Sequence, residues 1–219
     1  MLSRCLAVVI VLLPAYACAA DAWFLGAQGG VSTLSADGGT AINSGSALVS
    51  SYKPENGPVL QVFGGHHWND YLSVQGNYVW NSNDLTLTSV VSGADAFYEQ
   101  IRTSGQHQVS ADLLVYFRNL RSGIRPYLAV GGGVIRFASA QRSLTEAHGT
   151  TSPPPREFTS TAPAIRFSVG IDLRIRRNWY FRYSFAEIIR GNPVSAQLSP
   201  PGQRNLSNFQ NLLGFFRSF

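Results

Sequence analysis

The strongest constraint on the fold is a strict alternation of apolar and polar residues over stretches of about ten residues. In residues 164–175 (AIRFSVGIDLRI), Ile165 and Phe167 fall on one face, while Arg166 and Asp172 fall on the other. A period of two is that of a β-strand, because its successive side chains point to opposite faces. The sequence therefore predicts strands with one apolar and one polar face. The same pattern recurs in residues 71–81, 108–117 and 179–187.

Four further stretches complete a set of eight predicted strands. They are residues 22–32, 57–68, 125–137 and 211–219, and glycines blur the faces of 57–68 and 125–137. The connections between strands alternate in length. The long, polar ones cover residues 34–56, 82–105, 138–161 and 189–206, and the short ones cover residues 68–70, 118–123 and 176–178. Short turns on one side and long loops on the other are typical of an all-β fold, an eight-stranded antiparallel transmembrane β-barrel with up-and-down topology.

The N-terminus has the pattern of a secretory signal peptide. Arg4 precedes a short apolar run, residues 5–13, and small residues follow. The run is shorter than the roughly 20 apolar residues that a membrane-spanning helix needs. We therefore expect a signal peptide over residues 1–20 and one outer-membrane barrel domain over residues 21–219. Both cysteines lie in the removed segment, so no disulfide is expected.

The composition indicates a surface that largely avoids water. Only 13% of the residues are charged, whereas an average soluble domain has about 25%. Aromatic residues stand near the ends of the predicted strands, as in the girdles where barrel strands cross a bilayer interface. The competing architecture is a soluble β-sandwich, but charges and glycines in mid-strand on the polar faces favour a barrel with a narrow lumen. The expected girdle residues are Trp23, Trp68, Tyr71, Trp80, Phe117, Tyr127, Trp179 and Phe219.

Several segments resemble those of a known family. WFLGAQGGVS, NYVWN, RPYLAVGGGV and LLGFFRSF are similar to segments of the small eight-stranded OmpA-like and OmpX-like outer-membrane β-barrels. The resemblance covers residues 21–219, and it implies a monomeric barrel in the bacterial outer membrane, in contact with outer-membrane lipid. It also implies insertion by the barrel assembly machinery. Larger relatives carry a peptidoglycan-binding domain after the barrel, and that role is not carried over to this chain.

The C-terminal strand carries the expected assembly signal. Residues 211–219 end in Phe219, and Phe215 and Leu213 fall on the same face of the strand. This pattern resembles the signal that the barrel assembly machinery recognises. Arg217 stands where the family prefers an aromatic residue. An Arg this close to the membrane interface costs only about 0–1 kcal/mol.

Six charged residues in mid-strand are expected to face the lumen. The interior of an eight-stranded barrel is just wide enough for side chains to fill, and unpaired charges in such a space are costly. We therefore expect a salt-bridge network that fills the lumen. The alternative is a gate or narrow ion path lined by the same residues. They are Asp112, Arg166, Asp172, Arg174, Arg182 and Glu187.

The histidines form no metal-binding or catalytic motif. His66 and His67 are adjacent on a strand, so they point to opposite faces, and His107 and His148 are isolated. An outer-membrane enzyme needs a base, its orienter and a nucleophile near the outer rim, and residues 145–150 (TEAHGT) lack a recognisable spacing. Scattered basic residues disfavour nucleic-acid binding. We expect no cofactor, no metal and no enzymatic activity.

The four long connections are the predicted binding elements, because binding on such scaffolds is carried by loops. The first is rich in Gly, Ser and Ala and is expected to be flexible, whereas the second, residues 82–105, is expected to extend the strands as a hairpin. The third and fourth carry stiff proline runs, SPPPRE and LSPPGQ. We expect a structural or surface-interaction role, with an extracellular ligand bound through these loops. The alternatives are a narrow, salt-bridge-gated ion channel and, third, a lipid A-modifying enzyme.

Overall fold

The structure is a computed structural model that describes residues 22–35, 39–43, 46–54, 56–91, 97–147, 155–194, 198, 200–201 and 205–219. The predicted signal peptide and half of the residues in each of the two proline runs lie outside these ranges. None of the residues within them belongs to a helix that is long and apolar enough to cross a membrane. The strands are β1 (Trp23–Ser35), β2 (Gly39–Asn43), β3 (Ser46–Pro54), β4 (Asn56–His67), β5 (Leu72–Val91), β6 (Phe97–Tyr116), β7 (Ile124–Ala147), β8 (Glu157–Arg176), β9 (Trp179–Gly191) and β10 (Asn205–Ser218).

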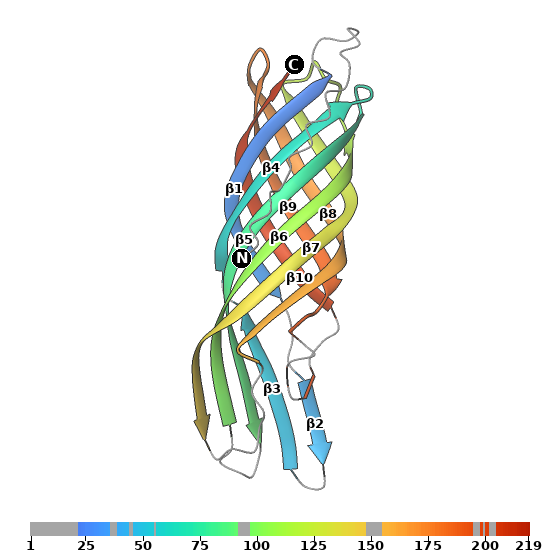
Figure 1. Cartoon of the computed structure of the whole chain (residues 1–219). Helices are drawn as coiled ribbons and strands as arrows, with labels where there is room; N and C mark the ends of the chain where they lie inside the picture. The colour runs from blue at the N-terminus through green and yellow to red at the C-terminus, as the bar shows by residue number, and fades with distance from the viewer. Residues whose placement is uncertain are drawn as a thin grey trace, which may run out of the picture.

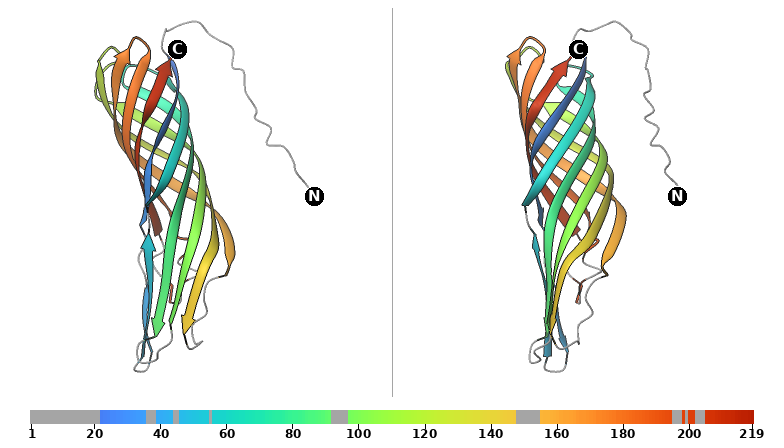
Figure 2. Two further views of the ribbon diagram at one scale, coloured as in Figure 1. Left: turned by 90° about the vertical axis from the view of Figure 1, so that its left-hand side faces the viewer. Right: turned by 60° about the vertical axis from the view of Figure 1, so that its left-hand side comes forward.

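Eight of these strands form a closed ring (Figures 1 and 2). β1 pairs antiparallel with β4, and each strand from β4 to β9 then pairs antiparallel with the strand that follows it in the chain. The ring closes where β10 pairs with β1, from Phe24 opposite Ser218 to Ser35 opposite Ser207. The predicted all-β, eight-stranded antiparallel barrel is therefore confirmed.

The two ends of the ring differ in length. At one end, which we name the turn end, residues 68–71, 117–123 and 177–178 join the strands, and the chain begins β1 and ends β10. At the other end the strands continue: β5, β6 and β8 have 20 residues and β7 has 24. About 9–11 residues suffice to span a bilayer. The additional residues form a sheet that projects beyond the ring, and we name this part the extension (bottom of Figure 1).

A hairpin in the first long connection belongs to the extension. β2 pairs with β3, and β3 pairs with β5 from Leu48 opposite Val91 to Pro54 opposite Leu85. The prediction that this connection is flexible is therefore wrong for β2 and β3. β5 extends beyond its pairing with β4 and offers free backbone N–H and C=O groups there, and pairing with them outweighs the low strand propensity of Gly and Ser. The second connection extends as the predicted hairpin, made by β5 and β6.

The side chains alternate between the lumen and the outer face as predicted. On β5, Ser73, Gln75 and Asn77 are buried in the lumen, while Val74 and Tyr78 lie on the outer face. The structure also assigns the faces of the two strands that glycines had blurred. Their buried, inward side chains are Val59, Gln61 and Phe63 on β4, and Tyr127, Ala129 and Ile135 on β7.

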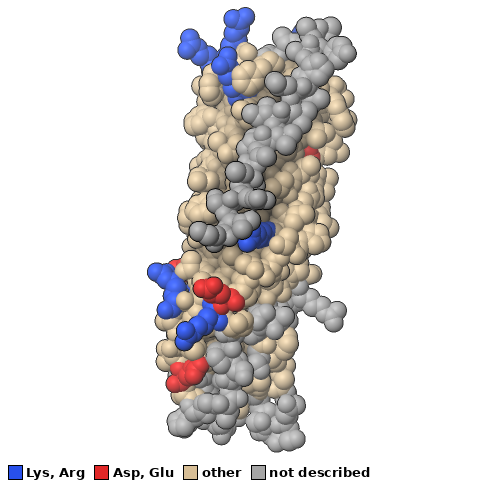
Figure 3. Space-filling model, viewed as in Figure 1, with Lys and Arg blue, Asp and Glu red and all other residues tan. Residues whose placement is uncertain are grey.

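The outer face changes from apolar to polar at one row of paired residues, which we name the boundary row. Trp80, His107 and Arg136 are Cα partners across β5, β6 and β7. Between the turn end and this row, the outward side chains on these strands are mostly Leu, Val and Tyr, and beyond it they are mostly Ser, Thr and charged residues. The rise from Leu72 to Trp80 is about 20 Å along the axis, at about 3.3 Å per residue and a tilt of about 40°. That height is close to an apolar band of about 25 Å. On the face shown in Figure 3, blue side chains project at the top, and blue and red side chains recur from mid-height downward.

Candidate functional site

Toward the turn end, the lumen contains a bidentate ion pair between Asp172 on β8 and Arg182 on β9. Arg182 Nε donates to Asp172 Oδ1 at 2.6 Å and Nη2 donates to Oδ2 at 2.8 Å. The third guanidinium nitrogen, Nη1, donates to Gln75 Oε1 at 2.6 Å, and the Tyr116 hydroxyl donates to Asp172 Oδ2 at 3.0 Å. Both charged side chains are fully buried. Their remaining hydrogen-bonding capacity is thus used by neutral partners, which is the condition under which a buried pair is tolerated.

A second buried ion pair lies nearby and is linked to the first. Arg166 Nη1 on β8 donates to Asp112 Oδ2 on β6 at 2.7 Å, and its Nη2 donates to Gln61 Oε1 on β4 at 3.1 Å. Asn77 Nδ2 donates to the same Asp112 oxygen at 2.9 Å. The Asn77 carbonyl oxygen accepts from Gln61 at 2.7 Å and from Gln75 at 2.6 Å, so one amide joins the two pairs. The lumen network therefore ties five strands together across the barrel. Its residues are Gln61, Gln75, Asn77, Asp112, Tyr116, Arg166, Asp172 and Arg182.

Glycines in the wall make room for this network. A Cβ on Gly131 would lie 2.1 Å from Asp112 Oδ1, and one on Gly170 would lie 2.4 Å from the Tyr127 ring. Gly132 lies on the outward side of β7, next to Gly131, and the nearest atom to a Cβ placed on it would be 3.7 Å away. The glycines that blurred the pattern of β7 thus mark close approach of side chains from the neighbouring strands.

Aromatic rings pack inside the lumen toward the turn end. Phe24, Phe63, Tyr180 and Phe216 form a buried aromatic cluster, in which Tyr180 and Phe216 stack at 4.7 Å and 5°. The Arg182 guanidinium lies over the Phe63 and Phe216 rings at 4.7 and 4.6 Å. The network is therefore capped by rings that also contact its cation.

Two residues at this end of the lumen differ from their predicted roles. The placement of Tyr127 in the outer girdle is wrong: its side chain is buried, and its ring lies 5.4 Å from that of Tyr116. Arg174 does not join the ion pairs. It donates from Nε to the Tyr180 hydroxyl at 3.2 Å and from Nη2 to the Leu120 carbonyl oxygen. Arg174 therefore links the aromatic cluster to the turn at residues 117–123.

The other end of the lumen is closed by an apolar cap. Phe137 of β7 and Leu206 of β10 pack there with side chains of β1, β5 and the segment after β9. Between the cap and the network, buried polar atoms of Gln106, Gln108 and Gln210 have no hydrogen-bond partner among the described residues. Two small apolar clusters lie among these polar side chains, so the lumen between the aromatic cluster and the cap is mixed in character. One cluster is Val59, Val79 and Leu212, and the other is Ile135, Ala164 and Ile188. The cap consists of Leu34, Leu85, Leu87, Phe137, Val194, Leu198 and Leu206.

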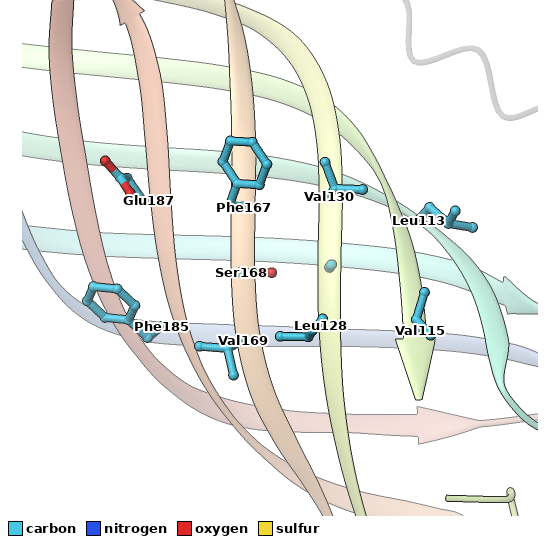
Figure 4. A pocket seen from close by; sticks show the side chains of 10 residues that line it. Leu113, Val115, Leu128, Val130, Phe167, Ser168, Val169, Phe185 and Glu187 are labelled. Atoms are coloured by element: carbon cyan, nitrogen blue, oxygen red, sulfur yellow. The ribbon is translucent and has the colours of Figure 1, made fainter. Parts of the chain in front are cut away.

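The outer wall has an apolar hollow of about 450 Å³ across β6 to β9 (Figure 4). Two adjacent rows of Cα partners line it, and an acyl chain is the chemical group that suits such a surface. One row is Leu113, Val130, Phe167 and Glu187, and the other is Val115, Leu128, Val169 and Phe185.

Glu187 lies on this outer wall, so its assignment to the lumen is wrong. Counting in twos from Trp179 passes through Phe185 to Glu187, and this parity sets its face. Its Oε1 accepts a hydrogen bond from Ser207 Oγ on β10 at 3.1 Å. It is a half-buried carboxylate beside the Phe167 and Phe185 side chains (Figure 4).

The other predicted girdle and assembly residues lie on the outer face. Trp23, Trp68, Tyr71 and Trp179 are about half exposed or more at the turn end, and Trp80 lies in the boundary row. The assembly-signal residues occupy the outward side of β10 and the residue that follows it; the Phe219 backbone N–H donates to the Trp23 carbonyl oxygen at 2.8 Å. These assembly residues are Leu213, Phe215 and Phe219.

The two adjacent histidines point to opposite faces, as expected. His67 lies inward, with Nδ1 2.5 Å from Ser73 Oγ, and His66 lies outward against Trp23 at 4.7 Å between ring centroids. His107 contacts Tyr78 OH through Nδ1 at 2.7 Å, and His148 lies outside the described residues. Within the described part of the chain, no three His, Cys, Asp or Glu side chains gather into a metal-binding group.

Comparisons with known proteins agree with this architecture. Residues 5–212 match the family described as outer membrane protein beta-barrel domain. Neisserial surface protein A is similar over 90% of this chain and 97% of its own, at 12% identity and a TM-score of 0.54. OprG from Pseudomonas aeruginosa is similar over 91% of this chain and 97% of its own, at 14% identity and a TM-score of 0.52. Identities this low show a shared fold alone. A comparison with curated protein sequences finds no match.

Proposed function

Because the chain belongs to the family of outer-membrane β-barrel domains and lies in the bacterial outer membrane, we propose that it displays a binding surface on its extension. In this account the barrel is a non-conducting anchor. The short turns of such barrels face the periplasm and the longer connections face outward. The extension is therefore the extracellular part of the molecule.

The observation that carries this proposal is the construction of the extension. It continues the sheet of the barrel beyond the boundary row and has its own apolar cap, so its shape is set by packing and does not depend on the bilayer. Its outward residues include Asp84, Glu99 and Arg142, which suit contact with water or a polar partner. Binding on a preformed surface avoids the entropic cost of ordering loops.

A buried arginine supports a preformed surface. Arg102 of β6 donates from Nε to Ser139 Oγ at 2.9 Å and from Nη1 to Gln100 Oε1 at 2.7 Å. It also donates to the carbonyl oxygens of Pro155 and Arg156 at 2.8 and 3.2 Å. This one side chain therefore fixes the start of the segment that leads into β8 against β6 and β7.

A shortened extension tests the proposal. Thr88 and Glu99 are Cα partners, so joining them through Asn-Gly in place of residues 89–98 removes the tip of the β5–β6 hairpin and leaves Leu85 and Leu87 of the cap. We expect intact protein in detergent to capture a partner from an extracellular fraction and this variant to lose it. The control is Arg121→Gln at the turn end, and this variant should still capture the partner. Capture that survives the deletion contradicts display by this tip.

A narrow channel is the second candidate, and the buried charged side chains of the lumen favour it. Arg125 and Arg190 are buried without a carboxylate in an ion pair among the described residues, so a conducting lumen would select anions. Conduction requires both the aromatic cluster and the apolar cap to open. Since both closures are packed, we propose that the resting barrel does not conduct.

We also propose that the protein is a monomer without enzymatic activity, inserted by the barrel assembly machinery through Leu213, Phe215 and Phe219. Deletion of Phe219 should impair assembly more than Arg217→Ala does, measured as the heat-modifiable folded fraction in outer membranes. Mass spectrometry of lipid A with and without expression should give the same profile; a new lipid A species contradicts the absence of activity.

A further inference from the structure

The turn end of the barrel carries a concentration of exposed positive charge. The turn at residues 117–123 contributes Arg118 and Arg121, and the turn between β8 and β9 contributes Arg176 and Arg177; all four side chains are exposed. We name these four residues the arginine collar. Asp70 is the one carboxylate side chain in the described turns of this end. Blue side chains project from this end in Figure 3, whereas blue and red groups are interspersed in the extension.

The collar arginines are not neutralised by the protein. The three ion pairs among the described residues are Arg142–Asp84, Arg166–Asp112 and Arg182–Asp172, and none includes a collar residue. Nearby, Arg217 is exposed as well, with its guanidinium 5.1 Å from the centroid of the Phe219 ring. The collar therefore presents unpaired guanidinium groups to whatever lies beside the turns.

Aromatic side chains fix the level of the collar relative to the membrane. Phe117 is 60% exposed and directly precedes Arg118, and Trp179 is 48% exposed and follows Arg177 by two residues. Exposed aromatic residues of this kind lie at the headgroup level of a bilayer. The guanidinium groups beside them consequently lie at the height of the phosphates, since long cationic side chains extend toward the headgroups.

We propose that the arginine collar binds anionic phospholipid headgroups of the phosphatidylglycerol type in the periplasmic leaflet. The planar guanidinium offers two parallel N–H donors to one phosphate, and several basic residues beside a membrane surface attract anionic lipid additively. The flanking aromatic residues favour a lipid over a polar polymer outside the membrane such as peptidoglycan, which offers no apolar phase for their rings. This proposal rests on the membrane insertion of the barrel with the turn end in the periplasm, and not on display by the extension.

Tryptophan fluorescence can report this binding directly. Of the four Trp residues in the chain, Trp23, Trp68 and Trp179 lie exposed at the turn end. The intact protein is reconstituted into mixed vesicles in which either phosphatidylglycerol or phosphatidylcholine carries brominated chains, and quenching gives their relative affinity. At about 0.1 M salt we expect a preference of about threefold or more for phosphatidylglycerol, which falls as salt screens the charges.

Two variants locate the effect. Replacing all four collar residues by Gln should bring the preference to about one. The control replaces three exposed cationic residues of the extension, Lys53, Arg142 and Arg156, by Gln and should keep the wild-type preference. Equal quenching by the two lipids in the wild type, or an unchanged preference in the collar variant, overturns the proposal. Sedimentation with peptidoglycan through the same arginines, without a lipid preference, overturns it too.

A salt titration covers the case in which the collar variant does not fold. At about 1 M salt the Debye length is about 3 Å, so the preference of the wild-type protein should disappear. A preference that persists at that ionic strength contradicts binding by exposed guanidinium groups. Loss of lipid preference alone leaves partner capture by the extension intact, so the two proposals fail separately.

Discussion

The barrel and the extension lie on opposite sides of the boundary row and share the long strands β5, β6 and β7, but they are stabilised in different ways. In the barrel, the outer wall is apolar and the lumen holds the two linked ion pairs. In the extension, the outer face is polar, and the interior contains an apolar cap together with the buried, hydrogen-bonded Arg102. The inward alternation continues without interruption across the boundary, for example from Asn81 to Leu85 on β5. The outward residues of a strand therefore match the solvent around it, apolar in the membrane and polar in water. Its inward residues match what fills the interior.

The largest expected effect on stability comes from breaking the buried Asp172–Arg182 ion pair, which is found in the barrel and not in the extension. Arg182→Leu leaves Asp172 buried and unpaired, so we expect a loss of about 3–5 kcal/mol in the free energy of unfolding. The double variant Arg182→Leu/Asp172→Leu removes both charges and should lose less. Urea unfolding in vesicles measures both values. A double variant that is less stable than the single one would show that the pair is not what limits stability.

The next effect probes the extension alone. Leu87 is fully buried in the apolar cap, and Leu87→Ala should lower the local stability of the extension by about 2 kcal/mol. Protease cleavage within the extension should become about 30-fold faster, because every 1.4 kcal/mol is tenfold. The barrel should keep its heat-modifiable mobility. Thr86→Ala, on the outward side of the same strand, is the matched control; equal cleavage in both variants would contradict a cap that holds the extension.

A smaller effect compares the two faces of one strand in the barrel wall. Gly131→Ala places a Cβ 2.1 Å from Asp112 Oδ1, whereas Gly132→Ala meets nothing closer than 3.7 Å. We expect the first to cost about 1–3 kcal/mol by overpacking and the second about 0.5 kcal/mol or less. Unfolding midpoints in urea give the difference. Similar losses for both would mean that glycine is required for backbone reasons on either face.

The smallest expected effect concerns an exposed ion pair of the extension. Arg142 Nη1 lies 3.0 Å from Asp84 Oδ2, with the side chains 61% and 36% exposed. Arg142→Ala should change the free energy of unfolding by only about 0–1 kcal/mol. A thermal unfolding series at low and high salt tests this. A loss comparable to that of Arg182→Leu would erase the contrast between a buried and an exposed pair.

The sequence predicts most of the barrel because its period alone decides the faces. The inward positions of Asp112, Arg166, Asp172 and Arg182 follow from parity, and their pairing follows from the narrow lumen. Glu187 has the opposite parity to Arg182, so its position on the outer wall was readable from the same strand. Its charge alone favours a position in the lumen, because Asp112, Arg166, Asp172 and Arg182 lie there.

Other features depend on contacts that no local pattern reports. Tyr127 faces the lumen with the same parity as Ala129 and Ile135, and Gly170 on the neighbouring strand β8 leaves room for its ring. The glycines that follow it on β7 remove the alternation that would show its face. The hairpin of β2 and β3 is specified by its pairing with the far part of β5, a contact between distant segments of the chain. The lumen network likewise depends on Asn77 and Gln75, polar residues whose roles appear only once five strands meet.

The central claim, a barrel closed at both ends with its function on the extension, is tested most directly by conductance in a planar lipid bilayer. Purified intact protein should insert, as shown by its heat-modifiable mobility after recovery, and give no current steps above those of the bare bilayer. A porin in the same apparatus provides the positive control. Reproducible steps whose size changes on charge reversal in Arg166→Glu would contradict the account and assign the lumen a role in ion passage.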